Sequence, residues 1–135
     1  MIDVENAVYT AVRAAVLEKY PDATVAAEYV RAPASFPAVT MSQIDSSVYQ
    51  RMMLPADALE QCAQITFELN IYTATPGRRK QEGKEILMVV DAALSRLGFV
   101  RILCNTVPNL HDSTIHRILA RYSGVVDKTG RVYTS

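Results

Sequence analysis

The 135-residue chain has few of the residues from which cross-links, metal centres and cofactor loops are built: two cysteines, two histidines and five glycines. Cys62 and Cys104 lie in separate apolar stretches with no second cysteine or histidine at ligand spacing, which predicts buried, reduced thiols. His111 and His116 are five residues apart, and on a strand an odd separation points to opposite faces. We therefore expect no disulfide, no metal site and no cofactor.

Sequence motifs for catalysis are also missing. The five glycines form neither a phosphate-binding loop nor a dinucleotide-binding pattern. No cysteine or histidine stands beside a candidate nucleophile in a known local motif. We therefore predict no catalytic residues, and we expect a protein that is not an enzyme.

Net charge and long apolar runs are absent as well. Fourteen basic and fourteen acidic residues cancel, which argues against nucleic-acid binding over a whole face, because such binding needs an excess of positive charge. No apolar run approaches the ~18 residues of a membrane span, and the start, MIDVENAVYT, carries acids where a signal peptide carries positive charge. The protein is expected to be made in the cytoplasm and to have no membrane partner.

The chain does have enough apolar sequence for one core. Half of the residues are hydrophobic and 21% are charged, and a chain of this length can bury roughly two thirds of its unfolded surface. No linker, repeat or low-complexity segment divides the sequence. Residues 1–135 are therefore predicted to form a single domain.

Helical periodicity marks two segments. Residues 4–19 place apolar side chains on one stripe, with Asp3 as the expected N-cap and Pro21 as the stop. A second helix begins near GRRKQEGKE and is expected to end at Gly98, since glycine enters the left-handed conformation without steric cost. The two stripes are Val8, Ala11, Val12, Ala15 and Val16, and Ile86, Val90, Ala93, Leu94 and Leu97.

Strand-like sequences fill most of the rest. Near residues 64–72, apolar residues at odd positions alternate with polar ones at even positions, which predicts one core face and one wet face. Residues 114–126 and 131–135 are expected to form a closing hairpin around the turn DKTG. Further strands are predicted at TVAAEYV, AVTMSQI and FVRILCNTV. No element is assigned to SSVYQRMMLPADALEQC, and we expect PNLHDS to be a loop.

The order of these elements decides the predicted fold class. A helix, two or three strands, a second helix and then more strands follow one another without a βαβ rhythm, which is typical of an α+β fold. We predict a mixed, mainly antiparallel β-sheet with two main helices packed on one face.

One basic cluster lies at the start of the second helix, where the helix dipole favours acids. Its members are Arg78, Arg79, Lys80 and Lys84. The cluster could serve an acidic partner surface or a phosphate backbone, or it could be a solvated loop tethered by Glu82 and Glu85. We favour the solvated loop.

The predicted strand at 114–126 has apolar side chains on both of its sides. Ile115, Arg117, Leu119 and Arg121 share one side, and His116, Ile118, Ala120 and Tyr122 share the other. One side could meet another subunit, or it could be buried under a helix, and the sequence supports both interpretations equally.

The second half contains the alternating strand ITFELNIY, the helix end DAALSRLGF, the loop PNLHD and the closing TIHRILARYSGVVDKTGRVYTS. With this pattern, roughly residues 62–135 resemble small siphophage tail-completion proteins. The first half matches that family only in its order of a helix followed by strands.

The resemblance implies a tail terminator, a virion structural protein at the head–tail junction. Such a protein assembles as a homo-oligomeric ring, expected here as a hexamer, caps the tail tube, ends its elongation and forms the head–tail joining interface. Its partners would be further copies of itself, the tail tube protein and a head-completion or connector protein, with DNA only as the passing genome. The candidate interface residues are Arg78, Arg79, Lys80, Arg117 and Arg121.

Other functions stay open beside the tail terminator. A head-side neck or connector protein is the nearest alternative, and an intracellular protein-binding adaptor is the alternative from a different class. A small enzyme ranks third.

Overall fold

The computed structural model describes residues 4–27, 36–48, 62–107, 114–127 and 132–133, which form two helices and six strands. The helices are α1 (Glu5–Lys19) and α2 (Arg79–Arg96), and the strands are β1 (Thr24–Ala26), β2 (Ala38–Val48), β3 (Cys62–Thr73), β4 (Val100–Val107), β5 (His116–Asp127) and β6 (Val132–Tyr133). Both predicted helices are confirmed within a residue or two, and the fold is α+β.

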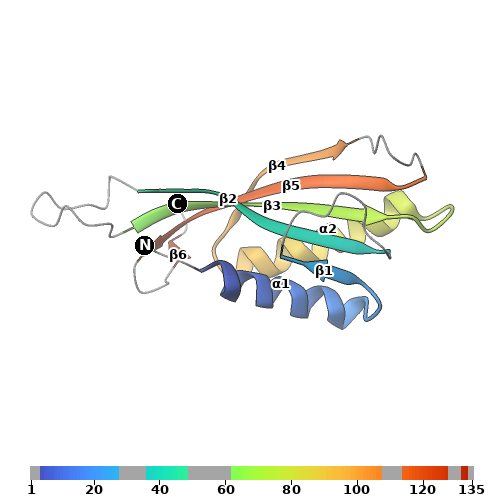
Figure 1. Ribbon diagram of the computed structural model, residues 1–135, viewed down its shortest axis with the longest axis horizontal. Coiled ribbons are helices and arrows are strands. Elements are labelled where there is room, and N and C mark those ends of the chain that lie inside the picture. The colour runs from blue at the N-terminus through green and yellow to red at the C-terminus, as the bar shows by residue number, and fades with distance from the viewer. Residues whose placement is uncertain (1–3, 28–35, 49–61, 108–113, 128–131, 134–135) are drawn as a thin grey trace, which may run out of the picture.

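The strands form one sheet in the order β1-β2-β3-β5-β4, and β6 also pairs with β5. Every pairing is antiparallel except that of β1 with β2, so the sheet is mixed and mainly antiparallel, as predicted. Both helices lie on the same side of this sheet, and β2 and β3 reach beyond them at one end (Figure 1). The closing hairpin is confirmed by the pairing of β5 with β6.

The core lies between the central strand β3 and the two helices. Four alternate side chains of β3 are fully buried there: Ile65, Phe67, Leu69 and Ile71. Above them pack Val8, Val12 and Val16 of α1 and Ile86, Val90 and Leu94 of α2. Burial of a large apolar side chain contributes about 1.5–3 kcal/mol, so this layer is the main stabilising element of the fold.

Local sequence decides where the helices begin and end. Gly98 follows α2 with φ 94°, the left-handed conformation predicted for it, and its N–H donates to the carbonyl of Ser95 at 3.0 Å. The N-cap of α1 is Val4, which makes no side-chain cap bond. The expected cap at Asp3 is therefore wrong, because the helix begins one residue later than that cap requires; Asp3 itself lies outside the described residues.

Two expectations about exposure are wrong. On the even-numbered face of β3, Thr66, Asn70 and Tyr72 are only 9%, 2% and 1% exposed. Arg117 of β5 contributes to this burial, because it lies over the ring of Tyr72 and bonds to Asn70. Cys104 is exposed rather than buried, since β4 is an edge strand whose side chains stay largely accessible. The side chain of Cys62 lies outside the described part of the chain.

Some predicted segments can be followed only in part. The strand predicted at TVAAEYV is described as β1 over Thr24–Ala26, and its last three residues lie outside the described ranges. β2 continues four residues past the predicted AVTMSQI, to Val48. Residues 49–61, the loop at 108–113 and most of the predicted DKTG turn lie outside the described ranges.

Position 124 of β5 requires a glycine, because an aromatic ring lies close to the backbone there. A Cβ atom there would lie 2.7 Å from Cδ1 and 2.9 Å from Cε1 of Phe99. Phe99 is 1% exposed and meets Phe67 edge to face, with ring centroids 5.4 Å apart. A side chain at position 124 would therefore displace a buried ring.

Leu94→Ala should lower the free energy of unfolding by about 2–5 kcal/mol, because it leaves a cavity where a fully buried side chain stood. Gln81→Ala, at an exposed position of the same helix, is the control and should change stability little. Chemical denaturation measures both variants. Equal stability would mean that the buried stripe of α2 is wrongly assigned.

Gly124→Ala should destabilise the protein by about 1–3 kcal/mol, because the added methyl group overpacks the ring of Phe99. Adding Phe99→Leu should recover part of that loss, since the smaller side chain makes room. Ser123→Ala, the neighbouring residue on the other face of β5, serves as the control. A glycine variant that unfolds at the same denaturant concentration as this control contradicts the packing argument.

Candidate functional site

Arg117 and Arg121 lie on the face of β5 that points away from the helices, which we call the open face. The register places Tyr72 opposite Arg117 and Glu68 opposite Arg121. The intervening residues of β5 point to the core, so the side of the strand that carries His116, Ile118, Ala120 and Tyr122 is the one under the helices. That side of β5 is therefore buried under the helices, and the side that carries the two arginines points away from them.

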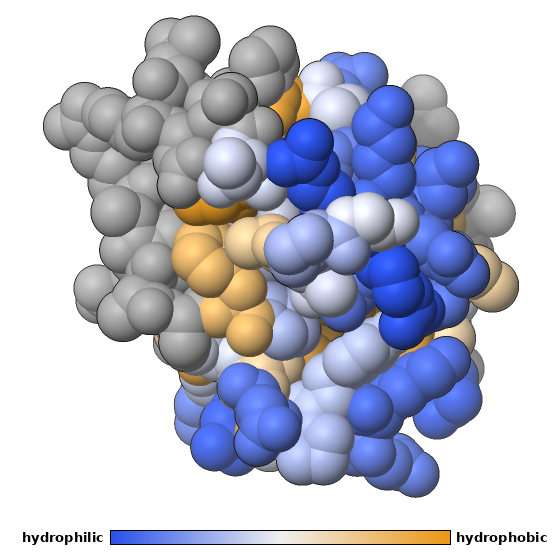
Figure 2. Space-filling model, turned by 90° about the vertical axis from the view of Figure 1, so that its right-hand side faces the viewer, coloured by the Kyte–Doolittle hydropathy of each residue, from blue (hydrophilic) through white to orange (hydrophobic). Residues whose placement is uncertain are grey.

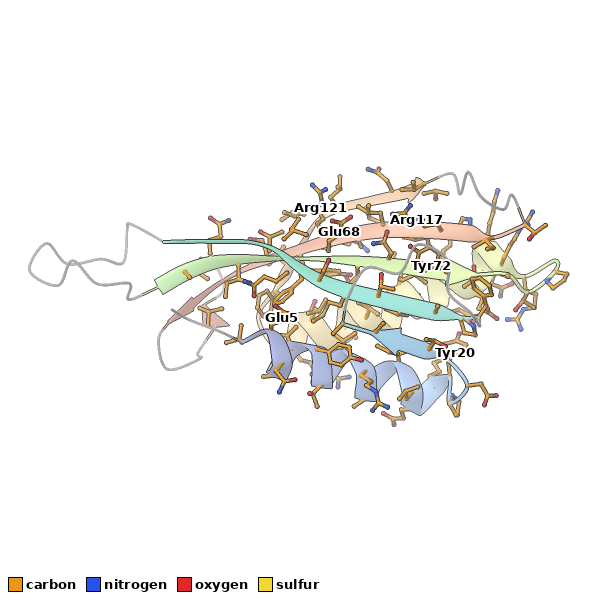
Figure 3. All side chains as sticks on the ribbon, in the orientation of Figure 1. Glu5, Tyr20, Glu68, Tyr72, Arg117 and Arg121 are labelled. Carbon is orange, nitrogen blue, oxygen red and sulfur yellow. The ribbon has the colours of Figure 1, made fainter. Side chains whose placement is uncertain are left out.

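Arg117 is held by two neighbours on β3. Its Nε donates a hydrogen bond of 2.9 Å to Oδ1 of Asn70, and its guanidinium lies 5.7 Å from the ring centroid of Tyr72. Asn70 and Tyr72 are themselves almost completely buried. The cation is thus fixed in position by a buried amide and a buried ring (Figure 3).

Arg121 faces Glu68 directly across the β3–β5 ladder. Its Nη2 lies 3.9 Å from Oε2 of Glu68, and the two side chains are 42% and 20% exposed. A pair with this exposure stabilises a fold by at most about 1 kcal/mol. The Nε of Arg121 is buried and has no hydrogen-bond acceptor within the described residues, so this guanidinium retains a donor that the described fold does not use.

The open face as a whole is mixed in chemistry. Beside its charged pair it carries the half-buried Leu119 of β5, and Gln64 Nε2 donates to Ser123 Oγ at 3.2 Å. Neither α1 nor α2 covers this face, as Figure 1 makes visible. Side chains of this kind, held by neighbours and partly accessible, are suited to charge-assisted hydrogen bonds with a polar protein partner.

The other three candidate residues lie apart from the open face, at the start of α2. Arg78 Nη2 is 3.7 Å from Oε1 of Glu85, and Arg79 Nη1 donates to the carbonyl of Thr114 at 2.7 Å. Lys80 is exposed and lines a hollow of about 550 Å³ at this end. The structure therefore does not bring the five candidate residues together in one site.

The tether expected from Glu82 and Glu85 is present only for Arg78. Glu85 pairs with Arg78 and also accepts a 2.8 Å hydrogen bond from the hydroxyl of Tyr20. Glu82 accepts from Thr75 Oγ1 at 3.1 and 3.2 Å instead. The preferred interpretation of a solvated loop tethered by both acids is thus correct for one of the four cations.

Sequence reasoning missed two tyrosines whose hydroxyls bond to α2, one from β5 and one from the end of α1. Tyr122 of β5 donates to Asp91 Oδ1 of α2 at 2.9 Å, and burial, helped by this bond, raises the pKa of its hydroxyl. Burial likewise raises the pKa of Tyr20 to about 12, with its hydrogen bond to Glu85 as the second cause. Both hydroxyls therefore stay protonated donors at neutral pH, which is a structural role.

The described residues contain no group of three or more His, Cys, Asp or Glu side chains that could hold a metal ion. No described helix is long and apolar enough to cross a membrane. A hollow of about 470 Å³ lies between α1 and α2. It is lined by the small residues Ala15, Ala92 and Ala93, by the charged residues Glu18, Lys19 and Arg96, and by Met88, which is 71% exposed.

His116 lies where β5 meets the start of α2. Its Cδ2 would be 3.1 Å from a Cβ at Gly83, so ring and helix are in close contact. Burial lowers the pKa of His116 below its ordinary value, and the nearby charges of Lys80, Arg79 and Lys84 lower it further.

The free energy of unfolding should fall as the pH drops below about 6.5. The unfolded chain binds a proton at His116 at that pH, whereas the folded protein, with its lowered pKa, does not. His116→Gln should therefore flatten the dependence between about pH 7 and pH 5, where most carboxylates stay ionised. Urea denaturation across this range is the measurement. An unchanged slope in the variant would assign the effect to other groups.

Comparison of the chain with known proteins gave no relative: no protein-family model matches it, and no curated protein matches it. Its function is therefore inferred from its own surfaces and from the pattern of residues 62–135.

Proposed function

We propose that the protein is a structural protein of a phage virion, a tail terminator. It assembles as a homo-oligomeric ring, expected as a hexamer, on the end of the tail tube, where it ends elongation and forms the surface that joins the tail to the head. The resemblance of residues 62–135 to siphophage tail-completion proteins motivates this proposal. Those residues include β3 and β5, the two central strands, together with α2.

The observation that carries the proposal is the open face. Both helices pack on one side of the sheet, and the other side presents Arg117 and Arg121 held by Asn70, Tyr72 and Glu68. The ion pair adds little to the stability of a monomer. A subunit that contacts other proteins needs a polar surface that is ordered and partly accessible. Such a surface need not add to the stability of the monomer.

A closed ring adds a second requirement. Head-to-tail contacts bury two different patches on every subunit, so one adhesive surface is not enough. The groove between α1 and α2 is a second surface of different chemistry, in which the exposed side chain of Met88 and small residues lie beside Glu18, Lys19 and Arg96. The two surfaces lie on opposite sides of the sheet, which is compatible with a subunit that has a neighbour on each side.

The deciding experiment is deletion of the gene from a phage that carries it, followed by electron microscopy of the lysate. Without a terminator, tails should have uncontrolled length, and these tails should fail to join heads. Supplying the wild-type protein from a plasmid should restore normal particles, and the stability-neutral Gln81→Ala variant should do so equally well.

Each result of this experiment has a distinct meaning. Tails of normal length that stay separate from full heads would favour a head-side connector in place of the terminator. Normal, head-joined tails in the deletion phage would end the proposal. A monomer in dilute solution would not, because assembly on the tube end can depend on the tube as a template.

A further inference from the structure

A cationic surface lies at the first two turns of α2. We call it the basic corner and define it as Arg79, Lys80 and Lys84 of α2 together with His116 of β5. Lys80 and Lys84 are exposed and one turn apart, so they project from the same side of the helix. His116 lies against the same part of the helix, since its Cδ2 would be 3.1 Å from a Cβ at Gly83, the residue that precedes Lys84. Residues from α2 and β5 thus converge on a single positively charged corner.

The nearby acids of α2 do not balance this corner. Glu82 accepts hydrogen bonds from Thr75, and Glu85 is engaged by Tyr20 and Arg78. Within the described ranges, neither Lys80 nor Lys84 forms an ion pair with an acid. The described acids therefore leave Lys80 and Lys84 without a direct counter-charge.

This arrangement is unfavourable for the helix itself. Cations in the first turn oppose the helix dipole, and like charges four residues apart repel each other. The lowered pKa of His116 reports the same repulsion, in addition to the effect of burial. The lysines are therefore unfavourable for α2 itself, although Glu82 supplies one acid in its first turn.

The corner also borders a hollow large enough for side chains of a partner. This hollow, of about 550 Å³, is lined by Pro76, Gly77, Arg79, Lys80 and Thr114, among others. It lies at the end of the molecule where β3 turns into α2, the end that faces the viewer in Figure 2. The described surface there is mostly hydrophilic, with a smaller hydrophobic area at one side.

We propose that the basic corner binds an acidic segment of a partner protein, with carboxylates of that segment contacting Lys80 and Lys84. A carboxylate-rich peptide fits the observations better than a nucleic acid. The cations occupy one corner of a chain whose net charge is zero, whereas a phosphate backbone needs a track of many positive charges. This inference does not depend on the proposed role in a phage tail, and the two proposals are tested by different experiments.

The first test measures the charge at the corner through His116. Proton NMR titration gives the pKa of its imidazole with and without a saturating hexaglutamate peptide, and the Lys80→Gln/Lys84→Gln protein, titrated in the same way, is the control. Bound carboxylates neutralise the surrounding cations, so the pKa of His116 should rise toward 6.5 in the wild type and should change little in the variant. Equal shifts in the two proteins, or none, would overturn the proposal.

The second test locates the binding by matched variants. The double variant Lys80→Gln/Lys84→Gln should bind fluorescein-labelled hexaglutamate roughly tenfold more weakly, because two surface ion pairs, each worth a few-fold in affinity, are lost. Arg13→Gln/Lys19→Gln removes the same charge from exposed positions of α1 and should bind like the wild type. Equal weakening in the two variants would mean that net charge, not the corner, attracts the peptide.

A third measurement decides the class of partner. A single-stranded oligothymidine should compete poorly with the labelled peptide at 150 mM salt if the corner recognises carboxylates. Competition by the oligonucleotide at lower concentration than by unlabelled peptide would replace the acidic protein with a nucleic acid. Circular dichroism of all variants confirms that the folded state is intact, since every substituted position is exposed.

Discussion

Burial of one face of β3 under both helices is the constraint on which the rest of the structure depends. Ile65, Phe67, Leu69 and Ile71 form the apolar floor, and every other element is arranged to cover or flank it. β2 and β5 pair with its two edges, and α1 and α2 pack on its apolar face. Neither α1 nor α2 covers the opposite face of the sheet (Figure 1).

That open face combines order with small energetic value for the monomer. Arg117 is fixed by Asn70 and Tyr72, whereas the pair of Arg121 with Glu68 is long and partly solvated. Surface pairs of this kind contribute little to stability. The pair of Arg121 with Glu68 is therefore ordered without being a main stabilising element of the fold.

The basic corner and the open face differ in the environment of their charged side chains. The basic corner is built from α2 and the first residue of β5, its lysines have no described acid partner, and it weakens the helix that carries it. On the open face, by contrast, Arg121 faces Glu68 across the β3–β5 ladder. The two surfaces therefore differ in whether a described acid lies beside the cations.

The sequence by itself determined the elements, because helical and strand periodicity and the stop signals are local. The stripe of α1, the alternation of β3 and the left-handed Gly98 were all predictable. Only the tertiary structure decided which strands neighbour one another. That order made β4 an exposed edge and Cys104 accessible, placed Glu68 opposite Arg121, and separated Arg117 and Arg121 from the basic residues of α2. Exposure and cross-strand partners depend on contacts between residues far apart in the chain, and no local pattern encodes them.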